Sequence, residues 1–329
     1  MGNKKIVTFV VETYKIEKMR RVFVFVAVLM VAFASEAKNP KVWKGLKSDI
    51  NIFVVSDSGR NGYYNQKPIA DLLGRMAEVV SPDFIVSSGD VHHFDGIQSV
   101  QDPLWMTNYE LIYSHPKLMV GWWSILGNHE HRGNTQAVID YSNISRRWNM
   151  PDRYYTKVYK EDGATIRLVM IDTTPLIDSY RNSKSTYTDV NKQDYEAQLK
   201  WLDSVLSTAT EDWVVVVGHH PIYADTSKGK RERLDMQSRV DSILRKYDNV
   251  DMYLCGHIHN FQHIRRDGCG IDYVVNSSAS TNRRVKPVEG TVFCNPESGF
   301  SMIAADKKSF NLYMINQKGK VIHTITRTK

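Results

Sequence analysis

The residues in this chain best suited to chemistry are histidines that come in pairs, with aspartates and an asparagine nearby. Eight of the eleven histidines fall in four pairs. Carboxylate and amide oxygens with neutral imidazole nitrogens suit borderline and hard divalent ions such as Mn, Fe and Zn. The positions of the cysteines do not support a thiolate site. The sequence predicts a metal site built from five segments: Asp57-Ser58-Gly59, Gly89-Asp90-Val91-His92-His93, Gly127-Asn128-His129-Glu130-His131, Gly218-His219-His220-Pro221 and Gly256-His257-Ile258-His259.

Each segment follows a short apolar run, and such runs rich in Val and Ile and bounded by Gly predict strands buried on both faces. Apolar residues at helical spacing over 195–206 and 236–247 predict helices between strands. Strands alternating with helices indicate an α/β fold, in which ligands gather at the carboxyl ends of strands. We expect the glycines to let the chain turn sharply there. The runs are 50–55, 84–86, 122–126, 166–171, 213–217 and 250–254.

The pattern changes after Ile271, where further β-type runs predict a second sheet that completes the same domain. No linker, repeat or low-complexity tract divides residues 38–329, so this part is expected to be a single domain. These runs are 273–275, 300–304, 310–315 and 321–325, with a turn at 316–319.

The first 37 residues are typical of a secretory signal. A basic head at 19–21 precedes an apolar run at 22–34 and small residues up to Ala37, which predicts a start at Met19 and cleavage near Ala37. The run is shorter than the ~20 residues of a membrane span, so no stable membrane anchor is expected. The protein is therefore expected to be secreted or periplasmic. Export would permit disulfides: Cys255 is expected to be a buried free thiol, whereas Cys269 and Cys294 could pair.

Composition excludes disorder and collagen, because 42% of the residues are hydrophobic and 24% are charged. The formal charge is +7, from 43 basic and 36 acidic residues. Removing 1–37 takes away six basic and three acidic residues, which leaves 37 against 33, or +4. No basic helix or aromatic stacking motif accompanies this excess, so no nucleic-acid partner is expected. We expect a monomer.

The five segments resemble the blocks of the calcineurin-like metallophosphoesterases, and more closely the small purple acid phosphatases of the tartrate-resistant type. The resemblance runs through nearly all of the chain after residue 37 and includes 94–98 and 141–149, outside the five segments. It implies a four-layer α/β/β/α sandwich of two mixed β-sheets flanked by helices. It also implies a cofactor of two metal ions and a small phosphorylated substrate.

The resemblance assigns roles residue by residue. It implies hydrolysis of phosphomonoesters by direct attack of a metal-bound hydroxide on phosphorus, with no covalent intermediate. His129 would contact the phosphate, together with Asn128, and protonate the leaving group as the general acid. His131 and His220 are not carried over as ligands. The implied ligands are Asp57 and His259 for the first metal, Asn128, His219 and His257 for the second, and Asp90 as the bridge.

Two positions depart from the family pattern. Purple members hold a ferric ion with a tyrosinate three residues after the bridging aspartate, and His93 stands there. Two divalent ions against Asp57 and Asp90 leave +2, the same as a trivalent–divalent pair against three anionic ligands. We therefore expect His93 to be a neutral ligand of a divalent pair, with His92 as the competing candidate. The loop after Pro221 places Lys228 where relatives have a substrate-contacting histidine.

Two other functions remain open at this point. A phosphodiesterase or nucleotide pyrophosphatase would share the ligands and differ in the walls of the cleft. A secreted protein that holds metal or phosphate without turnover is a third reading, and the complete ligand set together with His129 argues against it.

Overall fold

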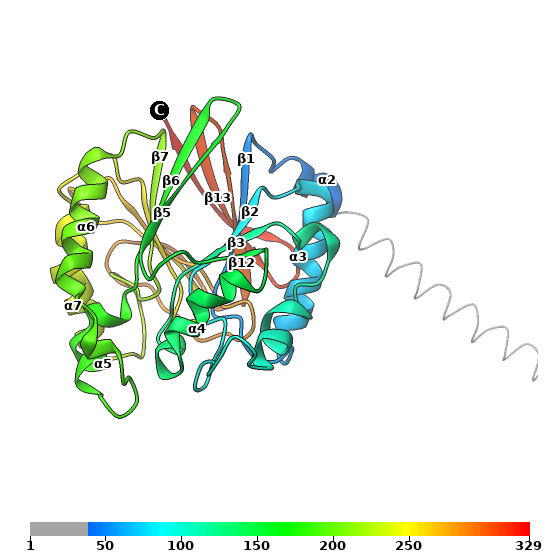
Figure 1. Ribbon diagram of the computed structural model, residues 1–329. Coiled ribbons are helices and arrows are strands. Elements are labelled where there is room, and N and C mark those ends of the chain that lie inside the picture. Colours follow the sequence, from blue (N-terminus) through cyan, green and yellow to red (C-terminus); the bar gives the residue numbers. More distant parts are fainter. Residues whose placement is uncertain (1–38) are drawn as a thin grey trace, which may run out of the picture. The chain divides into compact units, whose positions relative to one another are not determined.

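The computed structural model describes residues 39–329, which form parts of two compact units, residues 1–45 and 46–329 (Figure 1). The expected signal, its cleavage site and the expected domain boundary lie outside the described residues. The described part of the first unit holds one helix, α2 (Asn39–Lys44). Within residues 39–329, every helix is too short or too polar to cross a membrane.

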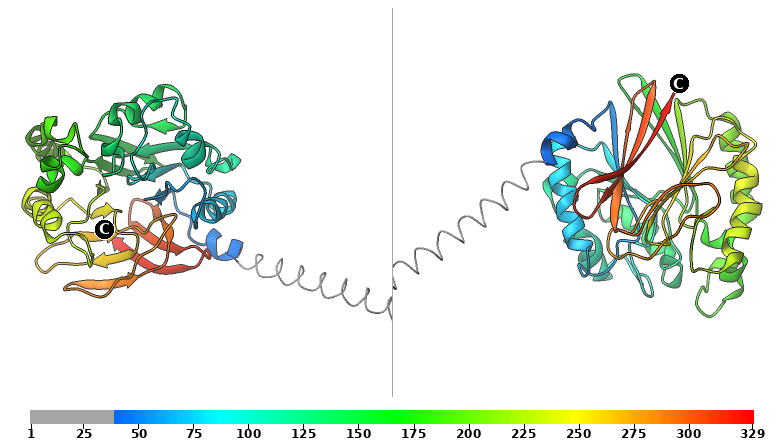
Figure 2. Two further views of the ribbon diagram at one scale, coloured as in Figure 1. Left: turned by 90° about the horizontal axis from the view of Figure 1, so that it is seen from below. Right: turned by 180° about the vertical axis from the view of Figure 1, so that it is seen from behind.

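The second unit contains two seven-stranded mixed sheets that lie face to face, as Figure 2 shows. Sheet A has the order β14-β13-β12-β1-β2-β3-β4 and sheet B the order β11-β9-β10-β8-β7-β6-β5. The strands of sheet A are β1 (Ile50–Val55), β2 (Phe84–Ser87), β3 (Gly121–Ser124), β4 (Trp148–Asn149), β12 (Gly299–Ala305), β13 (Ser309–Asn316) and β14 (Val321–Thr328). Those of sheet B are β5 (Tyr155–Glu161), β6 (Ala164–Met170), β7 (Trp213–Val217), β8 (Met252–Cys255), β9 (Phe261–Ile264), β10 (Asp272–Val275) and β11 (Thr291–Asn295).

Helices cover the outer faces of both sheets, so the predicted four-layer sandwich is confirmed. Figure 1 shows α3 (Gln66–Val80) outside sheet A and α6 (Tyr195–Thr208) and α7 (Lys230–Met236) outside sheet B. A π-helical turn (Gln237–Asp241) joins α7 to α8 (Ser242–Leu244). The remaining helices are α4 (Thr135–Asp140), α5 (Asp178–Asn182), a π turn (Met106–Glu110) and 3-10 turns at Pro116–Leu118, Glu130–Arg132, Tyr141–Asn143, Thr174–Leu176 and Val190–Lys192.

The strands expected from apolar runs are present, and their pairing explains their apolarity. Strands β1, β2 and β3 pair in parallel, as do β6, β7, β8 and β10. Every residue of β1, β2, β7 and β8 is buried, because helices cover one face and the opposite sheet covers the other. Strand β3 differs, since its residues alternate between buried and partly exposed.

The prediction that the C-terminal strands form the second sheet is wrong. Strand β12 pairs antiparallel with β1, and β13 and β14 continue outward from it, so these strands extend sheet A. Strand β10 joins sheet B, which begins earlier, with β5. Sequence shows where strands lie but not which neighbour each one pairs with, and here the chain returns to its first strand.

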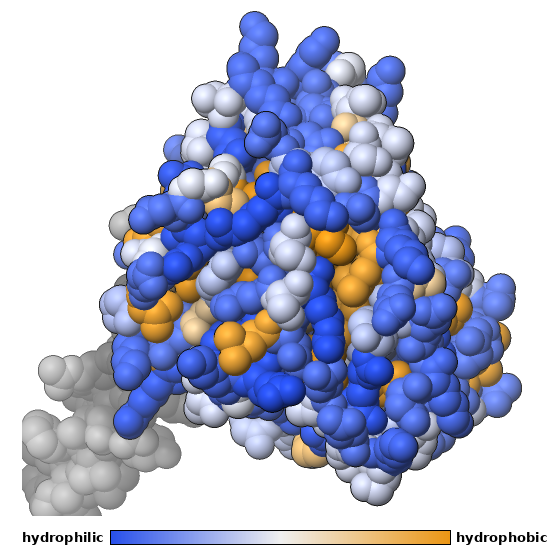
Figure 3. Space-filling model, turned by 90° about the vertical axis from the view of Figure 1, so that its left-hand side faces the viewer, coloured by the Kyte–Doolittle hydropathy of each residue, from blue (hydrophilic) through white to orange (hydrophobic). Residues whose placement is uncertain are grey.

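The main core lies between sheet B and its helices. Val214, Val216, Leu202, Leu206 and Met236 are fully buried there, and the predicted apolar faces of both helical stretches are the ones that pack inward. Outside this core, the face that carries α5, α6 and α7 is mainly hydrophilic, with small separate hydrophobic patches (Figure 3).

All three cysteines are free thiols. Cys255 is buried, as expected. Cys269 and Cys294, whose pairing the sequence left open, do not form a disulfide, and the sulfur of Cys269 lies 3.4 Å from the hydroxyl of Tyr273.

Candidate metal centre

The structure brings the chemistry-bearing segments together at one edge of the two sheets. Asp57 follows β1, Asp90 follows β2 and Asn128 follows β3, whereas His219 and His257 follow β7 and β8 of the other sheet. Each lies two to four residues beyond its strand. Because these strands are parallel within their sheets, their carboxyl ends share an edge, and the loops from both sheets meet there.

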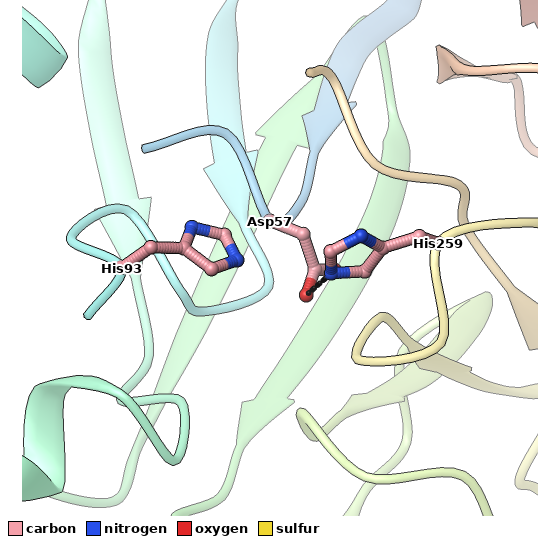
Figure 4. Close-up of side chains that lie close together, drawn as sticks. All are labelled: Asp57, His93 and His259. Carbon is pink, nitrogen blue, oxygen red and sulfur yellow. Dashed lines mark ion pairs between the residues drawn. The ribbon is translucent and has the colours of Figure 1, made fainter. Parts of the chain in front are cut away.

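Three overlapping groups of side chains have the spacing of metal ligands. Within each group, one ligand atom per residue lies within 4.8 Å of the others. Figure 4 shows the first group, with the rings of His93 and His259 on opposite sides of the Asp57 carboxylate. The Nε2 atom of His259 is 3.2 Å from Oδ1 of Asp57. The groups are Asp57–His93–His259, Asp90–His93–His129 and Asp90–His219–His257.

Asp90 belongs to the second and third groups, and its carboxylate also lies near His93, which the first and second groups share. Its Oδ2 atom is 3.2 Å from Nε2 of His219, 3.8 Å from Nε2 of His93 and 4.0 Å from Nε2 of His129. Its Oδ1 accepts a hydrogen bond from the backbone N–H of His129 at 3.0 Å. A carboxylate in this position can bridge two ions.

Hydrogen bonds to one ring nitrogen leave the other free in several of these histidines. Nδ1 of His219 lies 2.8 Å from the carbonyl of Ser88, and Nδ1 of His259 lies 2.6 Å from the Thr281 hydroxyl. In both rings, Nε2 faces the carboxylates. Such outer partners fix the tautomer and orientation of metal-binding imidazoles.

His257 is held at its other nitrogen. Its Nε2 lies 3.3 Å from Oε2 of Glu232, and the hydroxyl of Tyr180 donates to Oε1 of the same carboxylate. This leaves Nδ1 of His257 as its atom available to a metal.

Several proposed ligand atoms are buried without a hydrogen-bond partner, which tests whether the residues fit an ion. These atoms are Oδ1 of Asp57, Oδ1 of Asn128, Nε2 of His219 and both ring nitrogens of His93. Leaving such groups unpaired is costly, and bound cations would satisfy the two oxygens, Nε2 of His219 and one of the two ring nitrogens of His93. Nε2 of His92 and of His220 are also unpaired, but neither residue belongs to a metal-spaced group. The proposed ligands therefore differ from these two histidines because their unpaired atoms lie close to other potential ligand atoms.

The backbone of this site is strained at the proposed ligands themselves. Asp57, Asp90, His257 and His259 have positive φ angles of 49°, 56°, 73° and 56°. Non-glycine residues rarely adopt this conformation, and strained residues cluster at functional sites. The local turns that direct these side chains into the centre are therefore unfavourable by themselves, and other interactions in the fold must stabilise them.

The glycines of the five segments serve the site in two ways. Only Gly89 of these glycines has a positive φ. The others permit close approach: a Cβ on Gly127 would lie 2.2 Å from Oδ1 of Asp90, and one on Gly256 would lie 1.8 Å from Oγ of Ser56. These glycines give room to the ligand carboxylates and their partners.

Glu130, which the sequence did not single out, ties two ligand loops together, the one after β2 and its own loop after β3. Its buried carboxylate accepts the backbone N–H groups of Asp90 at 3.0 Å, His92 at 2.8 Å and Gly127 at 2.7 Å. Burial and the nearby charge of Asp90 raise the pKa of Glu130 to about 7. The sequence signal for Glu130 was its position between His129 and His131, but nothing in the sequence indicated which backbone groups it would accept hydrogen bonds from.

Electrostatics at the centre reflect buried carboxylates facing buried imidazoles. Burial alone would raise the pKa of Asp90, but His219 and His129 outweigh it and hold that pKa well below its usual value. Burial alone would lower the pKa of His219, but Asp90 raises it to about 10. Burial lowers the pKa of His93 to about 3, so its imidazole is neutral. Because a metal binds the neutral imidazole, an ion at this position would replace the proton whose binding Asp90 favours.

The proposed general acid, His129, lies at the edge of the centre and is partly exposed. Its Nδ1 is 2.8 Å from the carbonyl of Phe94, which leaves Nε2 facing Asp90. Burial lowers the pKa of His129, and Asp90 opposes this shift.

The remaining histidines lie outside the three metal-spaced groups, although the ring of His220 packs against those of His219 and His257, with centroids 5.1 Å and 4.3 Å away. His92 packs edge-on against Trp105, with ring centroids 4.4 Å apart, and burial lowers its pKa to about 3. His93, not His92, shares the metal-spaced groups. His131 lies 2.9 Å from Asp172, and His220 bonds to Thr173.

Lys228, the predicted substrate contact, is partly buried in the loop before α7. Its positive charge lies near enough to His257 to help lower that residue's pKa, after burial and His219. Arg60, which the sequence reasoning missed, lies near Asp57 and Asp90, whose charges oppose the lowering of its pKa by burial.

Comparison with known proteins gives a consistent family. The calcineurin-like phosphoesterase family profile matches residues 50–261. The chain is 33% identical over 216 residues to tartrate-resistant acid phosphatase type 5 of Oryctolagus cuniculus, covering 64% of this chain and 65% of that relative. It is 27% identical over 335 residues to purple acid phosphatase 3 of Arabidopsis thaliana, covering 96% and 89%. The chain thus spans just under two thirds of the first of these relatives.

Two solved structures share the fold at low sequence identity. One is GAP50, described as the anchor in the inner membrane complex of Plasmodium, with a TM-score of 0.71 and 21% identity over 86% of this chain and 89% of that one. The other is the purple acid phosphatase PPD1 from yellow lupin (Lupinus luteus) seeds, with a TM-score of 0.60 and 14% identity over 86% and 54%. At these identities the likeness concerns the fold.

Proposed function

The chain belongs to the calcineurin-like phosphoesterase family, and from that premise we propose that it is a dinuclear-metal phosphatase hydrolysing phosphomonoesters. The observation that carries this proposal is the convergence of buried, unpaired ligand atoms around Asp90. Oδ1 of Asn128 and the ring nitrogens of His93 have no hydrogen-bond partner in the protein, whereas a metal ion could bind that oxygen and one of those nitrogens.

The residues present fit two ions. Asp57, His259 and His93 would hold the first, Asn128, His219 and His257 the second, and Asp90 would bridge them. When bound, such a pair supplies an activated water as the nucleophile and positive charge that stabilises the phosphoryl oxygens. We expect a divalent pair drawn from Fe, Mn and Zn, because His93 contributes no negative charge.

The chain's own groups position the substrate and move the proton. Asn128 and His129 would contact the phosphate, and Lys228 would add a cation at the opening. Nε2 of His129 would donate its proton to the oxygen of the departing alcohol, while Nδ1–H stays bonded to the Phe94 carbonyl. General acid catalysis of this kind contributes roughly 10²–10⁴-fold.

The assay compares two chromogenic esters. Apoprotein reloaded separately with Fe, Mn or Zn would be assayed with 4-nitrophenyl phosphate and bis(4-nitrophenyl) phosphate. Faster hydrolysis of the monoester is expected. Preference for the diester would favour the phosphodiesterase or nucleotide pyrophosphatase alternative, which uses the same ligands. Asp90→Asn, which should lose the bridged metals, is the control for contaminating phosphatase.

A metal-binding protein without turnover is the second candidate. GAP50, described as an anchor, shares this fold, so the fold alone does not establish catalysis. Stoichiometric metal binding with no release of phosphate from either ester would support that candidate. We also propose export of the protein, on the sequence of residues 19–37.

A further inference from the structure

A polar cavity of about 460 Å³ lies beside the metal centre. Its wall includes Ile258 and Asn260, the two residues on either side of the proposed ligand His259. The rest of the wall comes from two loops, Asp225–Ser227 after β7 and Arg283–Lys286 after β10. The volume falls within the range typical of small-molecule sites.

The cavity is cationic. Arg283, Arg284 and Lys286 face one carboxylate, that of Asp225, so the charged lining sums to +2. The Asp225 carboxylate is already engaged, since its Oδ2 accepts the backbone N–H of Lys286 at 2.9 Å. Within residues 39–329, the three cations form no ion pair with any carboxylate. Thr226 and Ser227 add hydroxyl groups to the same wall.

Arg283 connects this cavity to the metal centre. Its backbone N–H donates to the carbonyl of His259 at 2.8 Å, and its guanidinium lies 3.5 Å from the carbonyl of His257. Its charge also helps to lower the pKa of Arg60, which lies near Asp57 and Asp90. A group extending from a phosphate at the centre past Arg283 would enter the cavity.

We infer that the cavity receives the leaving group of the substrate and selects phosphomonoesters whose leaving group carries a second anion, a carboxylate or a further phosphate. Unpaired cations beside bound phosphate would favour such a group by Coulomb attraction, and the hydroxyls of Thr226 and Ser227 could donate to its oxygens. A neutral leaving group would gain nothing from these cations. The inference rests on the proposed phosphatase function and names its substrate class.

The experiment compares matched substrates on matched variants. Benzyl phosphate and 4-carboxybenzyl phosphate differ by one remote carboxylate, so their leaving groups have similar basicity. Fructose 6-phosphate and fructose 1,6-bisphosphate form the corresponding phosphate pair. The test variant is Arg284→Gln/Lys286→Gln, which leaves Arg283 and its contacts with the ligand backbone intact. The control is Arg75→Gln/Arg146→Gln, which removes two exposed cations elsewhere and causes the same change in net charge.

We expect kcat/KM to favour 4-carboxybenzyl phosphate over benzyl phosphate, and the test variant to reduce this preference about fivefold, as two exposed ion pairs would. The control should retain the preference, and hydrolysis of benzyl phosphate should stay within about twofold in both variants, since neither pair of residues contacts a proposed ligand. If only the bisphosphate pair responds, the second anion is a phosphate. An unchanged preference in the test variant overturns the inference.

A binding measurement separates failure of this inference from failure of the proposed function. Benzylphosphonate and 4-carboxybenzylphosphonate are non-hydrolysable analogues whose Kd values calorimetry can measure in metal-loaded protein that turns over neither substrate. A tighter Kd for the carboxylated analogue, lost in Arg284→Gln/Lys286→Gln, supports the cavity even if no ester is hydrolysed. Equal Kd values for the two analogues overturn the inference whether or not the protein is a phosphatase.

Discussion

Glu130 should matter more for the stability of the metal-binding loops than any residue outside the ligand set. Glu130→Ala would leave the backbone N–H groups of Asp90, His92 and Gly127 buried without an acceptor. A buried donor left unpaired costs about 1–3 kcal/mol, and water entering the vacated space would recover part of this, so we expect a loss of about 4 kcal/mol. Glu130→Gln keeps the volume and one acceptor oxygen, and should cost about 2 kcal/mol.

Urea denaturation of metal-free protein measures this loss directly, because metal binding does not then contribute to the free energy of unfolding. Glu196→Gln, an exposed glutamate in the first turn of α6, is the control and should change stability by less than about 0.5 kcal/mol. Metal affinity measured by equilibrium dialysis should fall in the same order, Glu130→Ala below Glu130→Gln. A loss under about 1 kcal/mol in Glu130→Ala would refute the view that this carboxylate holds the two loops together.

Three further predictions concern histidines. Asp172 and Asp189 outweigh burial and raise the pKa of His131 to about 9 from 6.5. Protonated His131 should therefore stabilise the folded protein by about 3 kcal/mol below pH 6.5, and this contribution should disappear as the pH rises through 9. The free energy of unfolding of His131→Gln, compared with that of wild type across this pH range, checks the prediction. His129→Ala should keep its metals by mass spectrometry but lose about 100-fold in kcat with poor leaving groups, and full activity would exclude this residue as the acid. His93→Tyr in iron-loaded protein should gain a visible charge-transfer band, and its absence would show that residue 93 does not reach the iron.

Much of the fold could be predicted because local pattern decides strand type. Runs such as 50–55 and 213–217 are continuously apolar because each strand is buried on both faces. Such a run can be recognised as a buried strand without knowing which strands it pairs with. Strand pairing is different, since β12 returns across most of the chain to pair with β1. The residues of β12 do not indicate that β1 is its neighbour, so the C-terminal strands were wrongly predicted to form the second sheet. Whether Cys269 and Cys294 pair could not be decided from the sequence for the same reason, because sequence separation does not fix the distance between thiols.

The candidate site was predictable to the level of its ligand segments, because metal chemistry demands particular residue types. The supporting shell was not predictable, since Glu130 and Glu232 act through contacts with residues distant in sequence. The strain at Asp57 and His257 also ran against expectation, as local propensity would give the left-handed turns to glycine. At this site the geometry of the ligands overrides the local backbone preferences of the residues, and predictions from local sequence are expected to fail at such positions.

Two features of the site change its charge in the same direction. His93 brings a neutral imidazole to the position where purple relatives carry a tyrosinate, so only Asp57 and Asp90 offset the metals. Arg60 adds a cation whose charge is felt at Asp57, Asp90 and His93. A trivalent ion would leave the two metals and their ligands at +3 beside this guanidinium, whereas two divalent ions leave +2. Repulsion in a poorly solvated centre grows with that excess, so a neutral ligand at residue 93 and the nearby charge of Arg60 would both favour a divalent pair.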